Sequence, residues 1–355
     1  MRAWRILLVS AIVASTTIFL FAYTHEQDDV NGPVVTKWCD GNLNNGSPCT
    51  STVTWNLNPT ASNVNTSGGA SLLQTIQTSF ASWDQASLSG QSLVSVNIVQ
   101  GSTSETQTTP NASDCTDVIG FTDSSSDFST GTIAFTEIAT SFGPQPNQYS
   151  CSGSTTTYSC RLPSCIVDAD IEFNPTVNFA TAAPIPANDF DLQAIATHEI
   201  GHFLGMDHSG LASSIMYAFG DSGGVPQRVL STDDAIGIGS IYPSSNFSSL
   251  TGTLSGTILM GGSGIFAAHV VVTGTPSGAA VADGLTNSDG TYSIFVQPGQ
   301  YNVIALPLAG LYDISNYGGW ACGYEENGPP CCDPSTSGCT ATALTPPTNF
   351  SGKFN

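Results

Sequence analysis

Between residues 50 and 245, hydrophobic positions follow two periods, one typical of strands and one typical of helices. Residues 53–57 and 93–99 alternate apolar and polar side chains, as a strand with one buried face does. Between them, residues 71–87 repeat apolar side chains at intervals of three and four, which predicts an amphipathic helix. Further short strands are expected at residues 118–122, 131–137 and 166–173.

Two more helices are predicted beyond these strands. Apolar residues at helical spacing over 192–204 indicate a helix that buries one face, and we expect Asn188 or Asp189 to cap its start. A third helix is expected at residues 235–242, preceded by Ser231 in the position of a capping box. One helix, several short strands and then two helices together favour a mixed α+β fold.

The pattern changes after residue 250. Residues 244–250 have the composition of a polar hinge, and residues 251–306 show strand–turn–strand patterns without helix signals. Asp289 and Gly290 are typical of a hairpin turn. We therefore expect a small all-β sandwich with a Cys-rich tail after the α+β part, and domains at residues 35–245 and 250–355.

Composition restricts the partners of the chain. Only 9% of residues are charged, and six Lys and Arg face 27 Asp and Glu, for a formal net charge of −21. Nucleic acid and anionic membranes are therefore not expected as partners, because both require a basic surface. Asp168, Asp170 and Glu172 alternate along a predicted strand and could bind a structural Ca²⁺, although a solvated acidic face explains the same pattern.

The N-terminus has the pattern of an export signal. Arg2 and Arg5 precede an apolar run over residues 6–22. No A-x-A cleavage site is evident, and the run approaches the length of a membrane span. We predict that residues 1–25 are a signal peptide or an N-terminal anchor, and that the protein is secreted.

The ten cysteines fit export, because exported proteins commonly form disulfides. Six lie before residue 170 and four near the C-terminus, so each predicted domain can pair its cysteines internally. Cys39 and Cys49, separated by a loop rich in Gly and Asn, are the favoured local pair. A cysteine metal site is the weaker interpretation, since no C-x-x-C pair occurs.

One short segment holds three of the five histidines in the chain. On a helix, His198 and His202 project from one face, and Gly205 permits the turn that lets His208 return as a third ligand. Three imidazoles can hold a tetrahedral Zn²⁺ with its fourth position open, as catalytic sites do. Glu199 lies one residue round the helix, where it could act as general base on a water.

A bare HExxH sequence also occurs by chance in ordinary helices, but the third histidine and the glycine favour a zinc site. With Ser209 and the stretch Ser214-Ile215-Met216-Tyr217, the segment resembles the zinc signature and Met-turn of the metzincin metalloproteases. Ser209 and the Leu-Ser-Thr-Asp-Asp of residues 230–234 resemble the matrixin branch, the one that includes the matrix metalloproteinases.

The resemblance covers about residues 35–245 and implies a zincin-like catalytic domain with a twisted mixed sheet, a long zinc helix and a Met-turn. It implies that Met216 packs beneath the metal as a structural residue. It also implies a shallow cleft for an extended peptide, with residues 131–137 as the edge strand beside it and residues 218–230 lining the main specificity pocket.

Residues 251–306 resemble the transthyretin-like or carboxypeptidase-regulatory-like β-sandwich, through turn placement and the stretch DGTYSI…PGQYNV. His269 lies in an apolar strand pattern there and is expected to be a strand residue, not a ligand.

These observations together predict a secreted, monomeric zinc endopeptidase that cleaves peptide bonds of extracellular proteins with a zinc-activated water and Glu199 as base. The alternative is an exported adhesion or binding protein that uses its β-sandwich, with the protease domain secondary or inert.

Overall fold

The computed structural model describes residues 27–28, 34–38, 52–111, 114–123, 128, 131–142, 147–152, 157–160, 164–224, 228–287 and 289–308. The predicted export segment at residues 1–25, the Cys39–Cys49 pair and the Cys-rich tail lie outside the described residues. Within the described part of the chain, no helix is long and apolar enough to cross a membrane.

A mixed sheet forms one layer of the molecule. Its strands are β3 (Lys37–Trp38), β4 (Thr52–Leu57), β8 (Asn97–Gln100), β9 (Val118–Gly120), β10 (Ala134–Phe142) and β13 (Ser164–Phe173). They lie in the order β10-β13-β9-β4-β8, with β3 also pairing with β13. The edge strand β10 runs antiparallel to β13, and the other pairs are parallel. β10 overlaps the edge strand predicted at residues 131–137 but begins at Ala134, and it lies at the edge of the sheet.

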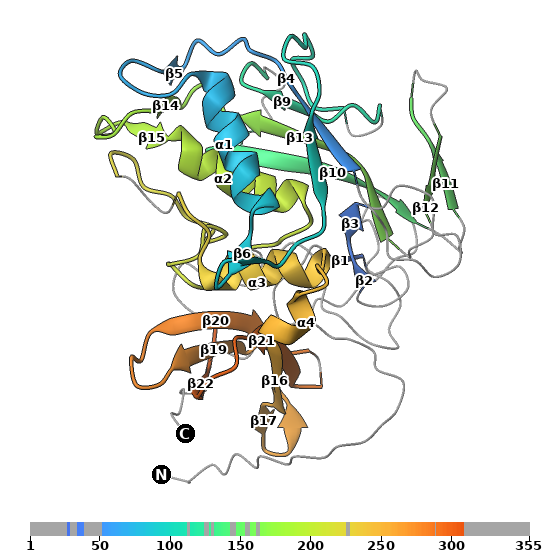
Figure 1. Cartoon of the computed structure of the whole chain (residues 1–355), viewed down its shortest axis with the longest axis vertical. Helices are drawn as coiled ribbons and strands as arrows, with labels where there is room; N and C mark the ends of the chain where they lie inside the picture. The colour runs from blue at the N-terminus through green and yellow to red at the C-terminus, as the bar shows by residue number, and fades with distance from the viewer. Residues whose placement is uncertain are drawn as a thin grey trace.

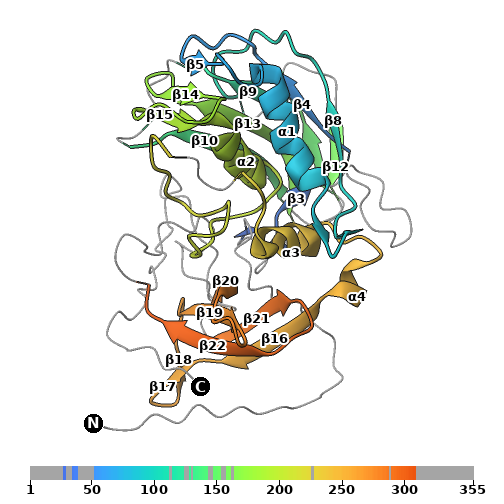
Figure 2. The same cartoon turned by 60° about the vertical axis from the view of Figure 1, so that its left-hand side comes forward.

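Three helices complete this part of the fold, namely α1 (Leu72–Asp84), α2 (Leu192–Phe203) and α3 (Thr232–Ile241). α1 and α2 pack against each other on one face of the sheet, and α3 lies beyond their ends (Figure 1 and Figure 2). The Trp83 indole joins the first two, donating its Nε1–H to the Thr197 carbonyl at 2.8 Å. Ser71 and Ser231 each close a capping box at the start of α1 and α3.

Two local predictions were wrong. The N-cap of α2 is Asp191, whose side chain accepts a hydrogen bond from the Ala194 amide, and not Asn188 or Asp189. Asp189 begins the short strand β15 (Asp189–Asp191), which places it before the helix. The predicted strand at 93–99 is strand only from Asn97, because the preceding backbone bonds instead to the chain after α3, as in Ser95 N–H to Tyr242 O.

Further short strands lie within the connecting segments of this part of the fold. They are β1 (Gln27–Asp28), β2 (Val34–Val35), β5 (Val64–Asn65), β6 (Ser87–Leu88), β7 (Gln91–Ser92), β11 (Asn147–Ser150), β12 (Thr157–Cys160) and β14 (Asn178–Ala180). β14 lies between β15 and β5 in a small parallel sheet just before α2.

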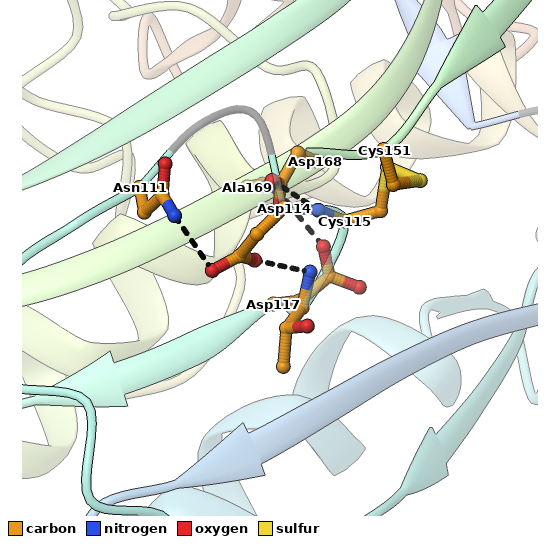
Figure 3. The surroundings of a disulfide bond; sticks show 8 residues. Asn111, Asp114, Cys115, Asp117, Cys151, Asp168 and Ala169 are labelled. Atoms are coloured by element: carbon orange, nitrogen blue, oxygen red, sulfur yellow. Dashed lines mark hydrogen bonds between the residues drawn. A yellow bond between two sulfur atoms is a disulfide. The ribbon is translucent and has the colours of Figure 1, made fainter. Parts of the chain in front are cut away.

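The acidic residues of β13 are buried, so the solvated-face interpretation of Asp168, Asp170 and Glu172 was wrong. The Asp168 carboxyl accepts the Cys115 amide at 2.6 Å, and the Asp170 carboxyl accepts the Asn111 amide at 2.7 Å. Cys115 also forms a disulfide with Cys151 (Figure 3). This pair agrees with the prediction of internal disulfides among the first six cysteines, and the buried acids hold the loop before β9.

A region of small sheets follows α3, and residues 252–308 are called here the C-terminal β region. It contains β16 (Gly252–Thr257), β17 (Leu259–Met260), β18 (Ser263–Gly264), β19 (His269–Gly274), β20 (Ala280–Leu285), β21 (Thr291–Val296) and β22 (Tyr301–Leu306). β16 pairs with β21, β17 with β18, and β19 lies between β20 and β22. The predicted hairpin at Asp289 and Gly290 is wrong, because the strands on its two sides belong to different sheets.

Residues 244–250, predicted to be a polar hinge, form a packed connection between α3 and the C-terminal β region. It contains the short helix α4 (Phe247–Leu250), and the Phe247 side chain is buried. Its ring meets Phe295 of β21 edge to face at 5.1 Å between centroids. α3 contacts both β20 and β21 (Figure 1). The C-terminal β region therefore lies directly against the helical layer, with one apolar core continuous between them.

Candidate metal centre

The end of α2 places the histidines. Phe203 and Leu204 would leave unpaired carbonyl groups at the helix end, and the Trp38 indole N–H and the Tyr242 hydroxyl donate to them at 2.7 Å and 2.9 Å. Gly205 then takes φ +91°, a conformation that other residues rarely adopt, and a Cβ there would lie 2.3 Å from a backbone oxygen. The chain therefore turns back sharply after the helix.

This turn brings His208 beside the two helical histidines. The His202 Nε2 atom lies 3.1 Å from His198 Nε2 and 3.2 Å from His208 Nε2. Tetrahedral zinc with Zn–N bonds of about 2.0–2.1 Å would separate its nitrogen ligands by about 3.3 Å. Among the described residues, these three form the one group of His, Cys, Asp or Glu with converging ligand atoms.

Hydrogen bonds fix which nitrogen of each helical ring carries the proton. His198 Nδ1 lies 2.7 Å from the Ile215 carbonyl, and His202 Nδ1 lies 2.8 Å from the Met206 carbonyl. A carbonyl only accepts, so each Nδ1 is the donor and each Nε2 lone pair points at the centre. Burial, and then the charge of His208, lower the pKa of His198 to about 3 and that of His202 well below its usual value. Neutral imidazoles with converging lone pairs fit a zinc ion.

Glu199 faces the edge strand. Its Oε2 accepts a hydrogen bond from the Thr136 hydroxyl of β10 at 2.8 Å, and the Glu199 side chain is buried. Burial raises the pKa of this carboxyl to about 7, against the hydrogen bond from Thr136, which lowers it. A cation at the three histidines would lower the pKa again, because an opposite charge favours the ionised form. Burial and a bound cation would thus shift the pKa of this carboxyl in opposite directions.

Met216 lies beneath α2 and is fully buried. It is so close to Gly201 that a Cβ on the glycine would lie 2.2 Å from the Met216 sulfur. Gly201 lies between His198 and His202 in the sequence of the helix, and because it has no side chain the methionine can pack closely under the helix at this point. Sequence reasoning missed this glycine, although its position inside a helix, where glycine is unfavourable, was a signal that close packing occurs there.

Asp234 fixes the turn that holds Met216. The Ser214 hydroxyl donates to its Oδ1, and the Ile215 amide donates to its Oδ2 at 3.0 Å. The same carboxyl accepts the Ser231 amide as part of the capping box of α3. The capping role was predicted from the sequence, and the anchoring of the residue 214–216 turn was not, because it joins segments about twenty residues apart.

Three converging imidazoles, with a buried carboxyl on the residue that follows the first of them, are the type of residue set found in mononuclear metal-dependent hydrolases. Residues 49–243, more than half of the chain, match the profile of the Matrixin peptidases, and the chain belongs to that family. Metalloendoproteinase 1 from Glycine max is 38% identical over 82 residues. That similarity covers 22% of this chain and 25% of the plant protein, so the chain spans about a quarter of its relative.

Membership of the family confirms the predicted resemblance over residues 49–243 and supports the prediction of a metalloendopeptidase. The mixed helix and sheet content agrees with a metzincin-like α+β fold, and zinc is the metal that the family implies. The structure places His269 in β19, as expected of a strand residue, with its ring against Asp283.

Proposed function

We propose that the protein is a secreted zinc-dependent endopeptidase that hydrolyses peptide bonds of extracellular proteins. The single observation that carries this proposal is the convergence of the Nε2 atoms of His198, His202 and His208, with the buried carboxyl of Glu199 on the next residue of the same helix. We assign the three histidines as zinc ligands, Glu199 as general base and Met216 as the structural floor of the site.

A zinc ion bound there supplies Lewis acidity that polarises a peptide carbonyl and lowers the pKa of a water. Glu199 accepts a proton from the attacking water and then donates it to the leaving amine nitrogen. Thr136 keeps the carboxyl oriented between these two transfers, since its hydroxyl donates to Oε2 at 2.8 Å. The Nδ1–H bonds to carbonyls keep His198 and His202 in the tautomer that binds metal.

The substrate backbone is proposed to lie along β10. This strand is at the sheet edge and carries Thr136, which contacts the general base. An extended peptide can add to such an edge through main-chain hydrogen bonds, with alternate side chains in pockets. An apolar pocket wall is supported near Gly220, where a Cβ would lie 3.4 Å from Ile195 and 3.5 Å from Ile133. We propose that residues 218–230 form the wall of the specificity pocket.

The test compares cleavage of unfolded casein by the zinc-loaded protein and by its Glu199→Gln variant, with zinc content measured in both. We expect the variant to retain zinc and to lose at least about 100-fold in kcat, the usual range for a general base. A strong zinc chelator should abolish wild-type activity, and added zinc should restore it. Undiminished cleavage by a zinc-replete Glu199→Gln protein would refute the assignment.

Four finer assignments remain proposals. Export is supported by the apolar run after Arg2 and Arg5 and by the Cys115–Cys151 disulfide. The chain is proposed to act as a monomer, and its C-terminal β region is proposed to have a transthyretin-like or carboxypeptidase-regulatory-like fold. Structural calcium is proposed only at Glu172, whose two carboxyl oxygens are buried and accept no hydrogen bond from the described residues.

A further inference from the structure

The C-terminal β region contacts the chain immediately after the third histidine. Asp283 of β20 accepts hydrogen bonds from the Ser209 hydroxyl and from the Gly210 amide, each at 2.8 Å. Ser209 directly follows His208, the one ligand of the proposed zinc site that lies outside α2. A side chain from beyond the matrixin match therefore holds the backbone next to a metal ligand.

Asp283 is itself held in place. The His269 Nε2 atom lies 2.6 Å from its Oδ2, and the Asp283 side chain is 5% exposed. The contact with Gly210 is tight, because a Cβ on that glycine would lie 2.5 Å from His269 Nε2 and 2.8 Å from the Asp283 carboxyl. Residue 210 must therefore be glycine for the two segments to approach this closely.

A single arrangement of protons accounts for the hydrogen bonds among Ser209, Asp233 and Asp283. The Ser209 oxygen lies within hydrogen-bond distance of both Asp283 (2.8 Å) and Asp233 (3.1 Å), but a hydroxyl has one proton to donate. Burial, and then the charge of Asp283, raise the pKa of Asp233 well above its usual value. A protonated Asp233 donates to Ser209, and Ser209 donates to the Asp283 carboxylate. Each polar group in the chain of bonds is thus satisfied.

Apolar contacts surround this polar cluster on both sides. Leu211 packs with Val271 of β19 and Ile304 of β22. Beyond the methionine turn, Tyr217 and Ala218 pack against a group of buried side chains of the C-terminal β region, namely Phe266, Ala267, Leu285 and Leu308. The segments that follow His208 and Met216 also bond to each other, through the Ser209 amide and the Met216 carbonyl at 2.9 Å.

We propose that Asp283, oriented by His269, is a positioning residue for the zinc site, and that the C-terminal β region completes the active centre. It fixes the backbone of Ser209 and Gly210 and thereby the position of the His208 ring, the ligand that the helix does not hold. The inference rests on the proposed function, since it assumes that His208 binds zinc. It assigns the region a role inside the peptidase, in place of a separate spacer or binding module.

The test uses the full-length, zinc-loaded protein with Asp283→Asn, His269→Leu and His269→Gln. The asparagine side chain offers only one acceptor oxygen, so Asp283→Asn loses the bond to Ser209 or those to Gly210 and His269. The glutamine side chain of His269→Gln keeps an amide nitrogen close to the position of Nε2, whereas leucine removes the donor. Asp289→Asn is the matched control, because Asp289 is an exposed carboxylate of the same region whose Oδ1 accepts hydrogen bonds from Thr291, away from the cluster.

The readouts are the rate of zinc release to a chromophoric chelator, kcat and KM separately, and the midpoint of thermal unfolding. Residues behind metal ligands typically contribute about 10–100-fold to metal affinity or activity. We expect Asp283→Asn and His269→Leu to speed zinc release about tenfold and to lower kcat with little change in KM. His269→Gln should restore both values, and Asp289→Asn should match the wild type.

The proposal would be overturned if Asp283→Asn and His269→Leu showed the zinc-release rate and kcat of the control and only a lower unfolding midpoint. The cluster would then be only a stabilising contact between the C-terminal β region and the rest of the fold. If Asp283→Asn does not fold, the two variants of the partly buried His269 decide alone. Zinc release needs no turnover, so it also separates this proposal from the proposed function. Failure of the proposed function would appear as zinc-loaded wild type without Glu199-dependent cleavage, whatever the Asp283 variants do.

Discussion

Replacing Gly201 with alanine is expected to destabilise the protein, although alanine is the better helix former. Helix propensity alone predicts a gain of about 1 kcal/mol in the free energy of unfolding. The added Cβ, however, would lie 2.2 Å from the Met216 sulfur and 2.8 Å from Trp83 Cζ2. Both neighbours are fully buried, so neither can move into solvent.

The size of the effect follows from these two overlaps. An extra methyl group in a packed core typically costs about 1–3 kcal/mol, and contacts this short belong at the upper end of that range. Subtracting the helix-propensity gain leaves a net loss of about 2 kcal/mol for Gly201→Ala. We also expect lower activity, because the helix must shift between Glu199 and His202 to relieve the contact.

The assay is urea unfolding at fixed zinc concentration for Gly201→Ala, Met216→Ala and the double variant. Met216→Ala alone should cost about 2–5 kcal/mol through the cavity that it leaves. In that background the sulfur contact is gone and only the 2.8 Å contact with Trp83 remains, so Gly201→Ala should cost about 1 kcal/mol less than in the wild type, or still less if Trp83 moves into the cavity. An equal loss in both backgrounds, or a gain in the wild type, would refute the reasoning.

Three further predictions concern the support of the site and the sheet. Thr136→Val should lower kcat about tenfold at unchanged zinc content, because Glu199 loses a hydrogen bond to a charged group worth about 1.5 kcal/mol. Arg228→Met should reduce the free energy of unfolding by about 2 kcal/mol in urea, since it removes the 2.7 Å contact to the buried Asp191 cap, discounted for the partly exposed guanidinium. Burial raises the pKa of Glu172 from 4.5 to about 9. The folded state therefore favours the protonated form, and its stabilisation, present below pH 4.5, is lost as pH rises toward 9. Glu172→Gln should flatten this loss in unfolding experiments across that pH range.

Each of these predictions has a contrasting outcome. Thr136→Ser keeps the hydroxyl, so a similar loss of kcat in that variant would contradict the hydrogen-bond argument. Arg228→Lys should recover part of the stability, and a loss that disappears in high salt would mean that the pair is only a surface contact. For Glu172→Gln, unchanged pH dependence would contradict the buried-acid argument. A calcium-dependent stabilisation seen only with Glu172 would instead support the proposed calcium ligand.

Local signals in the sequence predicted much of this structure. Ser231 closes the predicted capping box at the start of α3, because a capping box involves residues only three positions apart. The capping box at Ser71 was not predicted, although the helical pattern was expected to begin there. The spacing of His198 and His202 predicted that both rings share one face, since helix geometry alone determines it. Gly205 takes the positive φ that the turn requires.

Features that depend on distant segments were missed. Alternating apolar residues at 291–296 and 301–306 are compatible with pairing to each other, yet the first pairs with β16 and the second with β19. The alternation reports only which face is buried, not which strand lies beside it. The cap of α2 was misplaced for the same reason, because the strand pairing of β15 decides where the helix begins.

In the candidate metal centre, too, some residues are held by local contacts and one by contacts with distant segments. Two of its histidines are held by the helix, whose hydrogen bonds connect residues four apart. The third depends on Gly205, on the Met216 carbonyl and on Asp283, which lies far beyond His208 in the chain and bonds to Gly210 across 73 positions. The matrixin match ends at residue 243, before that aspartate. The span recognisable by sequence is therefore shorter than the physical unit that holds the third histidine, and a fragment cut at the family boundary lacks one of its supports.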